Sequence, residues 1–243
     1  MAKFGLIGKN IDYSFSQKYF IRKFELENLT HSFQNFDISS IEAIKSIISK
    51  NKNLKGLNVT IPYKESILPY LDKIDKEAKN IGAVNTIKIE KDNTLTGYNT
   101  DNYGFAKALI EHFPISNKKA LVLGTGGASK AITYVLDALS FEYKCISRTK
   151  GDNCLSYNQL SKNIIEEHSL IINCTPLGTH PNINECPSIP YNYLNENHLL
   201  FDLVYNPNET LFLKKGKFRN ARTSNGLKML EYQAEKSWGI WNS

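Results

Sequence analysis

The hydrophobic pattern of the first hundred residues switches repeatedly between a period of two and a period near 3.6. Short apolar runs alternate with segments in which apolar residues recur every three or four positions, as Phe20, Ile21 and Phe24 do. The expected elements are strands over 3–8, 31–37 and 56–61, helices over 17–28 and 41–50, a short helix after Pro62, and strands over 82–90 and 94–98 joined as a hairpin. This half is predicted to be a βαβ series that ends in a hairpin.

A second series follows a helix predicted over 102–112. It opens with the dense apolar strand 118–123 and continues with a helix over 130–139, strands over 143–146, 169–173 and 199–202, and a final helix over 226–238. Loops are expected between the later strands. Strands that alternate with helices in this way are typical of an α/β fold with a doubly wound parallel sheet, so we place a domain junction near Asp101.

Composition narrows the class of protein. The chain has 243 residues, 41% of them hydrophobic, which excludes collagen-like, disordered and disulfide-stapled chains and allows one large domain or two modest ones. No apolar run approaches the roughly 18–20 residues that span a bilayer, and residues 1–8 are too short for a signal-peptide core. We therefore expect a cytoplasmic protein with no membrane partner.

The net charge of +6 comes from 30 basic against 24 acidic residues. Only four of the basic residues are arginines, and the lysines are scattered among many asparagines. Nucleic-acid-binding proteins usually cluster their cations with arginine prominent among them, so a solvated lysine surface is the better interpretation.

The cysteines show no spacing suited to a zinc site, and none is predicted. They are interpreted as reduced structural thiols: Cys145, Cys154, Cys174 and Cys186.

A glycine-rich turn joins the apolar strand 118–123 to the following helix. The turn reads Gly124-Thr125-Gly126-Gly127-Ala128-Ser129, with Ser129 in place of the usual third glycine. Gly124 allows a tight turn, Gly126 lets the backbone approach a pyrophosphate, and the helix N-terminus offers N–H groups and a positive dipole end. In this context the turn predicts a dinucleotide site.

The end of the next strand indicates which dinucleotide is bound. An NAD site normally has Asp or Glu there, whereas this chain has Ser147-Arg148-Thr149-Lys150. Arg148 can present its planar guanidinium to a 2′-phosphate while Lys150 adds positive charge, so NADP is favoured over NAD. The alternative is that these residues form only an exposed basic loop.

Ser14 and Ser16 precede the first predicted helix. Ser16 is a natural N-cap, which by itself explains one serine. Two hydroxyl groups at a helix N-terminus also form a site for a carboxylate.

Strand alternation places Asn58 and Thr60 on one face, with Val59 and Ile61 on the other. Lys64 lies just beyond this strand at the start of the expected short helix, where a cation is locally unfavourable, and this favours a functional role. Asp101 precedes a helix and could simply cap it. If the two residues are neighbours, they supply a cation and a carboxylate that can move a proton, which near a nicotinamide is dehydrogenase chemistry.

These segments together resemble the shikimate dehydrogenases along nearly the whole chain. The motifs that carry the resemblance occur in order: Ser14-Phe15-Ser16, residues 58–64, residues 82–86, Asn99-Thr100-Asp101, the glycine turn, Ser147-Arg148-Thr149, residues 173–178, residues 202–207, and residues 225–230 with Gln233-Ala234. The family usually has His before the first serine, Pro after the second, and Asn before the cofactor arginine. This chain has Tyr13, Gln17 and Ser147 at those positions.

The resemblance implies reversible reduction of 3-dehydroshikimate to shikimate by NADPH. It assigns catalysis to Lys64 and Asp101, the substrate carboxylate to Ser14 and Ser16, the ring hydroxyls to Asn58, Thr60, Asn85 and Gln233, and the border of the substrate to Tyr205. It assigns the cofactor to Gly124, Thr125, Gly126, Gly127, Ala128, Ser129, Ser147, Arg148, Thr149 and Lys150, with Leu203 and Gly226 beside the nicotinamide.

It also implies that the terminal helix packs on the first domain. The expected domains are thus residues 1–101 with 225–243 for the substrate and residues 102–224 for NADP, in a monomer or homodimer whose partner is a small molecule. Two alternatives stay open: a quinate/shikimate dehydrogenase that uses NAD, and a non-catalytic NADP-binding regulator.

Overall fold

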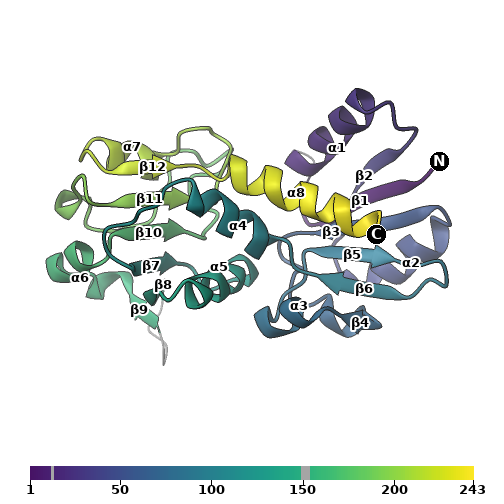
Figure 1. The fold of residues 1–243 in the computed structure, drawn as a ribbon, viewed down its shortest axis with the longest axis horizontal. Helices are drawn as coiled ribbons and strands as arrows, with labels where there is room; N and C mark the ends of the chain where they lie inside the picture. Colours follow the sequence, from purple (N-terminus) through teal and green to yellow (C-terminus); the bar gives the residue numbers. More distant parts are fainter. Residues whose placement is uncertain (12–13, 149–153) are drawn as a thin grey trace. The chain divides into compact units, whose positions relative to one another are not determined.

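The computed structural model describes residues 1–11, 14–148 and 154–243 and contains two compact units (Figure 1). Unit 1 comprises residues 1–100 and 234–243, and unit 2 comprises residues 101–233. The division falls inside the last helix, α8 (Leu227–Trp241), so unit 1 is completed by the final ten residues of the chain.

Unit 1 is built on a six-stranded mixed sheet in the order β2-β1-β3-β5-β6-β4. Its strands are β1 (Lys3–Gly8), β2 (Ser32–Asp37), β3 (Leu54–Val59), β4 (Lys73–Ile74), β5 (Thr86–Ile89) and β6 (Leu95–Tyr98). Strands β1, β2 and β3 are parallel, as a βαβ series requires. Strands β5 and β6 pair antiparallel, which confirms the predicted hairpin.

The helices of unit 1 cover both faces of this sheet. They are α1 (Phe15–Leu26), a 3₁₀ turn (Ile41–Ala43) leading into α2 (Ile44–Lys50), a 3₁₀ turn (Leu68–Tyr70) and α3 (Lys76–Ile81). The short helix expected after Pro62 is only a 3₁₀ turn, and it begins later, at Leu68. Residues 61–67 form turns, and Pro69 lies at the start of the following 3₁₀ turn, where its missing N–H is tolerated.

Side chains of β1 point alternately to the two faces of the sheet, so they contribute to two separate parts of the core of unit 1. Phe4 and Leu6 face α1 and the end of α8, whereas Ile7 faces the layer formed by α2 and α3. The ring of Trp241 stacks on Phe4 with centroids 5.0 Å apart, and its Nε1 donates to the carbonyl oxygen of Ile87 at 3.0 Å. The final helix is therefore part of this core.

Unit 2 contains a six-stranded sheet that is parallel throughout, in the order β12-β11-β10-β7-β8-β9. Its strands are β7 (Lys119–Leu123), β8 (Glu142–Ser147), β9 (Cys154–Ser156), β10 (Leu170–Asn173), β11 (Leu199–Asp202) and β12 (Arg222–Ser224). Ala120 and Val122 face α4 (Asp101–Ile110) and α5 (Gly127–Ala138). Leu121 and Leu123 face α6 (Lys162–Glu167) and α7 (Leu211–Lys217). The doubly wound sheet is thus confirmed.

Several short elements of unit 2 lie where only loops were expected. Helices α6 and α7 have six and seven residues, and strands β9 and β12 have three each. Such lengths are too short to establish a period in the sequence. Local capping signals are nevertheless present, since the hydroxyl of Ser161 accepts from the Ile164 N–H and that of Thr210 from the Leu213 N–H.

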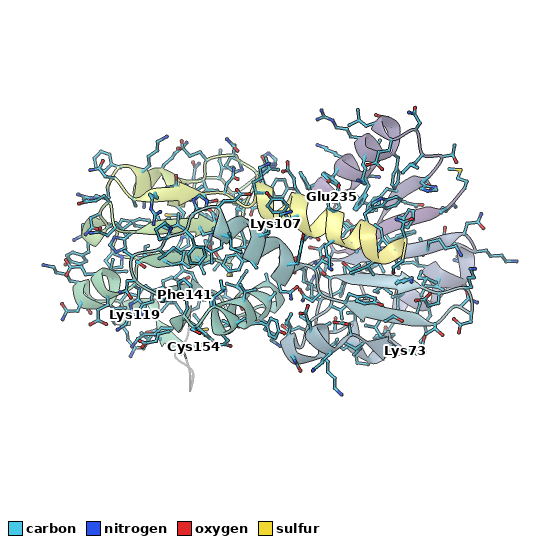
Figure 2. The ribbon with its side chains drawn as sticks, in the orientation of Figure 1. Lys73, Lys107, Lys119, Phe141, Cys154 and Glu235 are labelled. Carbon is cyan, nitrogen blue, oxygen red and sulfur yellow. The ribbon has the colours of Figure 1, made fainter. Side chains whose placement is uncertain are left out.

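The lysines labelled in Figure 2 lie on separate elements, with Lys73 on β4, Lys107 on α4 and Lys119 on β7. Lys107 lies over the ring of Tyr232 at 4.3 Å, and Lys119 is 3.6 Å from Glu142. None of the helices in the described ranges is long and apolar enough to cross a membrane.

Candidate active site

The glycine turn of unit 2 has the geometry of a nucleotide-binding turn. Gly124 has φ +109°, a value that side chains disfavour, and its N–H donates to Ile146 O at 2.8 Å. Gly126 has an ordinary φ of −83°, and a Cβ placed there would meet nothing within 4 Å. Gly124 is therefore required by the backbone, whereas the open space at Gly126 leaves room for another molecule to approach the main chain.

The turn leads directly into α5, which starts at Gly127 and has Gly126 as its N-cap, with no side chain capping it. The Ser129 hydroxyl donates back to Gly126 O at 2.6 Å and so braces the turn. Strand β7 lies between β10 and β8, where the winding of the sheet reverses. This is the position at which open α/β sheets bind ligands.

The carboxyl ends of β10 and β11 carry a buried polar network beside this turn. Asp202 accepts hydrogen bonds from Asn173 Nδ2 at 2.9 Å, from Val204 N at 3.0 Å and from Thr210 Oγ1 at 2.6 Å. Burial nevertheless raises the pKa of Asp202 to about 6. The network fixes the loops that follow both strands.

The raised pKa of Asp202 gives a prediction for stability. The folded state keeps this proton up to about pH 6 and the unfolded state only to about pH 4, so the favourable contribution of Asp202 is lost as pH rises between them. We expect Asp202→Asn to gain stability relative to wild type by on the order of 2–3 kcal/mol between about pH 4 and pH 7. Urea unfolding of both proteins at the two pH values measures this difference. A constant difference would contradict it.

The predicted cofactor arginine follows β8. Ser147 ends that strand, pairs in register with Ser156 of β9, and is half-buried, whereas Arg148 is exposed. Thr149 and Lys150 lie outside the described residues. Of the two cations predicted to lie near the 2′-phosphate, Arg148 is therefore the one within the described residues.

The structure brings together the residues predicted to lie beside the nicotinamide. A Cβ on Gly226 would lie 2.1 Å from the carbonyl oxygen of Leu203, and the Gly226 N–H donates to Val204 O at 3.1 Å. No side chain fits between the two segments, so residue 226 must be glycine. Tyr205, two residues after Leu203, is half-buried.

The two serines of unit 1 differ from the prediction in their capping role. The N-cap of α1 is Ser14, whose backbone is extended and whose Oγ accepts from the Gln17 N–H at 3.4 Å. Ser16 lies within the first turn and is buried, so the prediction that it caps the helix is wrong. The Ser14 hydroxyl also donates to Asn35 Oδ1 at 3.1 Å, and Asn35 Nδ2 donates to Gln17 Oε1 at 3.2 Å. Gln17 thus helps to hold the partner of Ser14.

At the end of β3, Asn58 is 3% exposed and its Nδ2 donates to Thr86 Oγ1 and Ser237 Oγ, both at 3.2 Å. Its Oδ1 is buried and accepts no hydrogen bond from the described residues. Asn85 is equally buried, and its Oδ1 accepts from Thr100 N at 2.7 Å. Sequence reasoning selected the two asparagines but missed the hydroxyl groups around them.

The strand ends at Val59, so Ile61 does not continue the face of Val59 as predicted, and it is 62% exposed. Thr60 and Lys64 follow the strand and are half-buried, and the main-chain oxygen of Lys64 accepts from Val84 N at 2.8 Å. No helix begins at Lys64, so Lys64 does not lie at an unfavourable helix end as predicted.

The remaining predicted residues belong to unit 2. Asp101 is the first residue of α4 and is buried at 5% exposure, directly after Thr100 in the chain. Gln233 is equally buried, and its Nε2 donates to Leu230 O at 3.1 Å.

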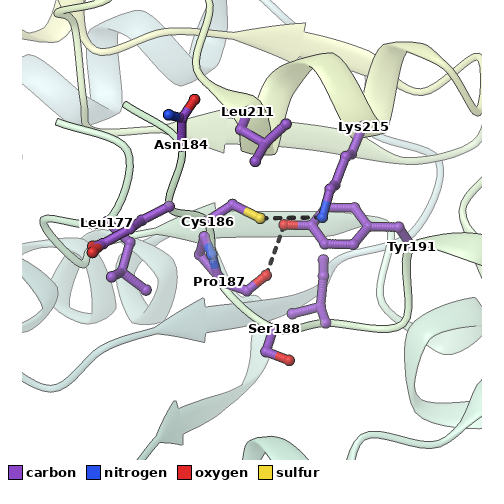
Figure 3. Close-up of a pocket in the computed structure, with 10 residues that line it drawn as sticks. Leu177, Asn184, Cys186, Pro187, Ser188, Tyr191, Leu211 and Lys215 are labelled. Carbon is purple, nitrogen blue, oxygen red and sulfur yellow. Dashed lines mark hydrogen bonds between the residues drawn. The ribbon is translucent and has the colours of Figure 1, made fainter. Parts of the chain in front are cut away.

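A separate pocket of about 440 Å³ lies on unit 2 between α7 and the segment 177–191 (Figure 3). Lys215 Nζ donates to Cys186 Sγ at 3.4 Å and lies 4.8 Å from the centre of the Tyr191 ring. The residues that line it include none of those predicted for substrate or cofactor.

The four cysteines are free, and burial raises the pKa of Cys145 to about 11, which keeps its thiol protonated. No cluster of His, Cys, Asp and Glu suited to a metal occurs within the described residues.

The fold and the glycine turn define a two-unit α/β protein with a Rossmann-type dinucleotide-binding unit. Residues 6–87 match the family model described as the shikimate dehydrogenase substrate binding domain. The shikimate dehydrogenase (NADP(+)) of Methanococcus maripaludis is 39% identical over 98% of this chain and 90% of its own. This chain belongs to the shikimate dehydrogenase family.

Two solved structures extend the likeness to three dimensions. Shikimate dehydrogenase 1 of Peptoclostridium difficile is 40% identical, with a TM-score of 0.86 over 100% of this chain and 92% of its own. Shikimate 5-dehydrogenase of Thermus thermophilus, solved in complex with NADP(H) and shikimate, is 29% identical, with a TM-score of 0.87 over 99% of this chain and 93% of its own.

Proposed function

We propose that this protein catalyses the reversible, NADPH-dependent reduction of 3-dehydroshikimate to shikimate, in the pathway to chorismate and the aromatic amino acids. The observation that carries the proposal is the likeness, over 98% of the chain, to an NADP(+)-dependent shikimate dehydrogenase. The direct test supplies shikimate and NADP to the purified protein and follows the absorbance of the reduced nicotinamide. Absence of shikimate-dependent reduction would overturn the proposal.

The glycine turn fits the cofactor. When bound, NADPH supplies the hydride for the carbonyl carbon of the substrate. The backbone from Gly124 to Ser129 and the N-terminus of α5 would hold the pyrophosphate, because Gly126 leaves its approach open and no side chain caps this helix end. Arg148, exposed at the end of β8, would hold the 2′-phosphate.

In unit 1 the proposed substrate groups are hydroxyls and amides. Ser14 and Ser16 at the start of α1 would bind the carboxylate of the substrate, where the helix end adds a positive dipole. The unpartnered Oδ1 of Asn58 would accept from a ring hydroxyl, with Thr60, Asn85, Tyr205 and Gln233 as further substrate contacts.

Lys64 and Asp101 are the proposed catalytic pair. Lys64 supplies the proton to the alkoxide oxygen that develops as the carbonyl is reduced, and takes it back in the reverse direction. Asp101, buried at the start of α4, is the proposed carboxylate member of the pair. Positioning of the substrate and transfer of the proton then both contribute to catalysis.

The glycine turn offers a prediction that separates binding from folding. Gly126→Ala should lower the thermal unfolding temperature by no more than about 2–4 °C, since its methyl group meets no protein atom within 4 Å and only the preference for glycine at the N-cap is lost. It should raise the Kd for NADP about tenfold or more, because the methyl group occupies the space of the pyrophosphate. Calorimetric titration and a thermal melt measure the two effects. As a contrast, Gly124→Ala should lower the unfolding temperature because of its φ of +109°.

The partner of this activity is a small, polar metabolite, and the proposed compartment is the cytoplasm. We propose a monomer or homodimer that acts without nucleic acid.

A further inference from the structure

Three hydroxyl groups from distant segments of unit 1 meet in its buried core. Thr86 begins β5, Thr100 follows β6 and Ser237 lies on α8, and all three are 0% exposed. Their oxygens form a closed triangle with sides of 2.8, 3.1 and 3.2 Å. We call these residues the hydroxyl triad.

The donors and acceptors of the triad match those of the two neighbouring asparagines. Each hydroxyl proton has an acceptor inside this cluster, either the next oxygen of the triangle or, for Thr86 and Thr100, the Oδ1 of Asn85 at 3.2 Å. Each hydroxyl oxygen can then still accept a hydrogen bond from an amide N–H. Asn58 Nδ2 supplies N–H groups to Thr86 and Ser237, and Asn85 Nδ2 donates to Thr100 Oγ1 at 3.0 Å. Both hydrogens of the Asn58 amide thus have acceptors inside the core.

The orientation of the Asn58 amide follows from this arrangement. Its Nδ2 also lies 3.3 Å from the main-chain oxygen of Asn85, which can only accept. A flipped amide would place oxygen against oxygen there, and its Oδ1 could bond Thr86 and Ser237 only by drawing their hydroxyl protons away from acceptors inside the cluster. The side that remains is Oδ1, which is buried and accepts nothing from the described residues.

We infer that Thr86, Thr100 and Ser237 are positioning residues that hold Asn58 with its nitrogen inward, so that Asn58 meets the substrate only as a hydrogen-bond acceptor. The inference rests on the proposed function, in which Asn58 contacts a ring hydroxyl. A hydroxyl at that ring position donates to Oδ1, whereas a substituent without a proton leaves this oxygen unsatisfied. The triad thereby makes this part of the site specific for a hydroxyl.

Thr86→Val and Thr86→Ser form a matched pair for the test, because the first removes the hydroxyl and the second keeps it. The substrates are shikimate and analogues in which fluorine replaces each non-reacting ring hydroxyl in turn. Wild type and Thr86→Ser should use one of these analogues about 10- to 100-fold less well than shikimate by kcat/KM. In Thr86→Val this ratio should shrink at least about threefold, because the amide is no longer held and the hydroxyl loses its advantage.

Ser237→Ala provides a second variant should Thr86→Val fail to fold, and it is expected to act in the same direction. An unchanged ratio in the folded variant, or a wild type that uses every fluorinated analogue as well as shikimate, would overturn the inference. Failure of the proposed function gives a different result, namely no reduction of NADP by wild type with shikimate itself.

A second measurement tests the positioning role without requiring catalytic turnover. In protein labelled with ¹⁵N-asparagine, the side-chain amide signal of Asn58 is assigned by its loss in Asn58→Asp. Its hydrogens should exchange slowly with solvent in wild type and Thr86→Ser, and about tenfold or more faster in Thr86→Val. Equal exchange in all three proteins would overturn the positioning role whatever the activity.

Discussion

We expect Lys64→Ala to lower kcat for shikimate oxidation by about 10²- to 10⁴-fold, which is the usual contribution of a placed general acid or base. The change in KM should be small, because the proposed proton transfer occurs in the transition state rather than on binding. Steady-state kinetics with saturating NADP measure both constants. The measurement bears directly on the proposed role, since Lys64 is half-buried next to β3 rather than on an open surface.

Lys55→Ala is the matched control, because Lys55 is an exposed lysine on β3, the strand that precedes Lys64. It should retain the wild-type kcat. A Lys64→Ala enzyme with wild-type kcat would remove Lys64 from the mechanism. Asp101→Asn should also lower kcat, and the double variant should lose little more than the worse single variant, because residues that act as one unit are not additive.

The second large effect concerns the choice of cofactor. Arg148→Gln should lower kcat/KM for NADP about 10- to 100-fold, since a hydrogen bond to a charged group contributes roughly 1.5–3 kcal/mol. The value for NAD, which has no 2′-phosphate, should change by no more than about twofold. Kinetics with both cofactors give the ratio.

Arg219→Gln is the control for this change, because Arg219 is an exposed arginine of the same unit. Equal losses with NADP and NAD would show that Arg148 does not read the 2′-phosphate. A wild type that prefers NAD, with quinate as well as shikimate, would favour the alternative quinate/shikimate dehydrogenase. Binding of NADP without turnover would favour the regulator.

Secondary structure is predicted most accurately where the residues that indicate an element are contiguous in the sequence. The apolar run of β7 followed by Gly124 and Gly126 specifies a strand, a turn and a helix within a dozen residues, and the structure contains all three. The parallel sheet of unit 2 follows from the same kind of local periodicity. By contrast, the helix expected after Pro62 depended on too few residues to show a helical period, and the structure has turns there as far as Ile67.

The hydroxyl triad could not be read from spacing, because Thr86, Thr100 and Ser237 meet only after three segments have folded together. Partial signals existed: Thr86 and Thr100 each adjoin a predicted site residue, and Ser237 lies one helical turn after Gln233. The capping role of Ser14 was missed for another reason. Two serines separated by one residue give the same capping signal, and only the extended backbone at Ser14 distinguishes them.

The end of α8 also determines what can be learned from intrinsic fluorescence. The chain has two tryptophans, Trp238 and Trp241, and both belong to unit 1. Trp241 is buried against Phe4 and Phe20, so its emission changes when that aromatic core opens. Unit 2 has no tryptophan and is silent in such an experiment. A melting curve recorded by tryptophan emission therefore reports the aromatic core of unit 1, and the nucleotide-binding unit needs a separate probe, such as the emission of bound NADPH.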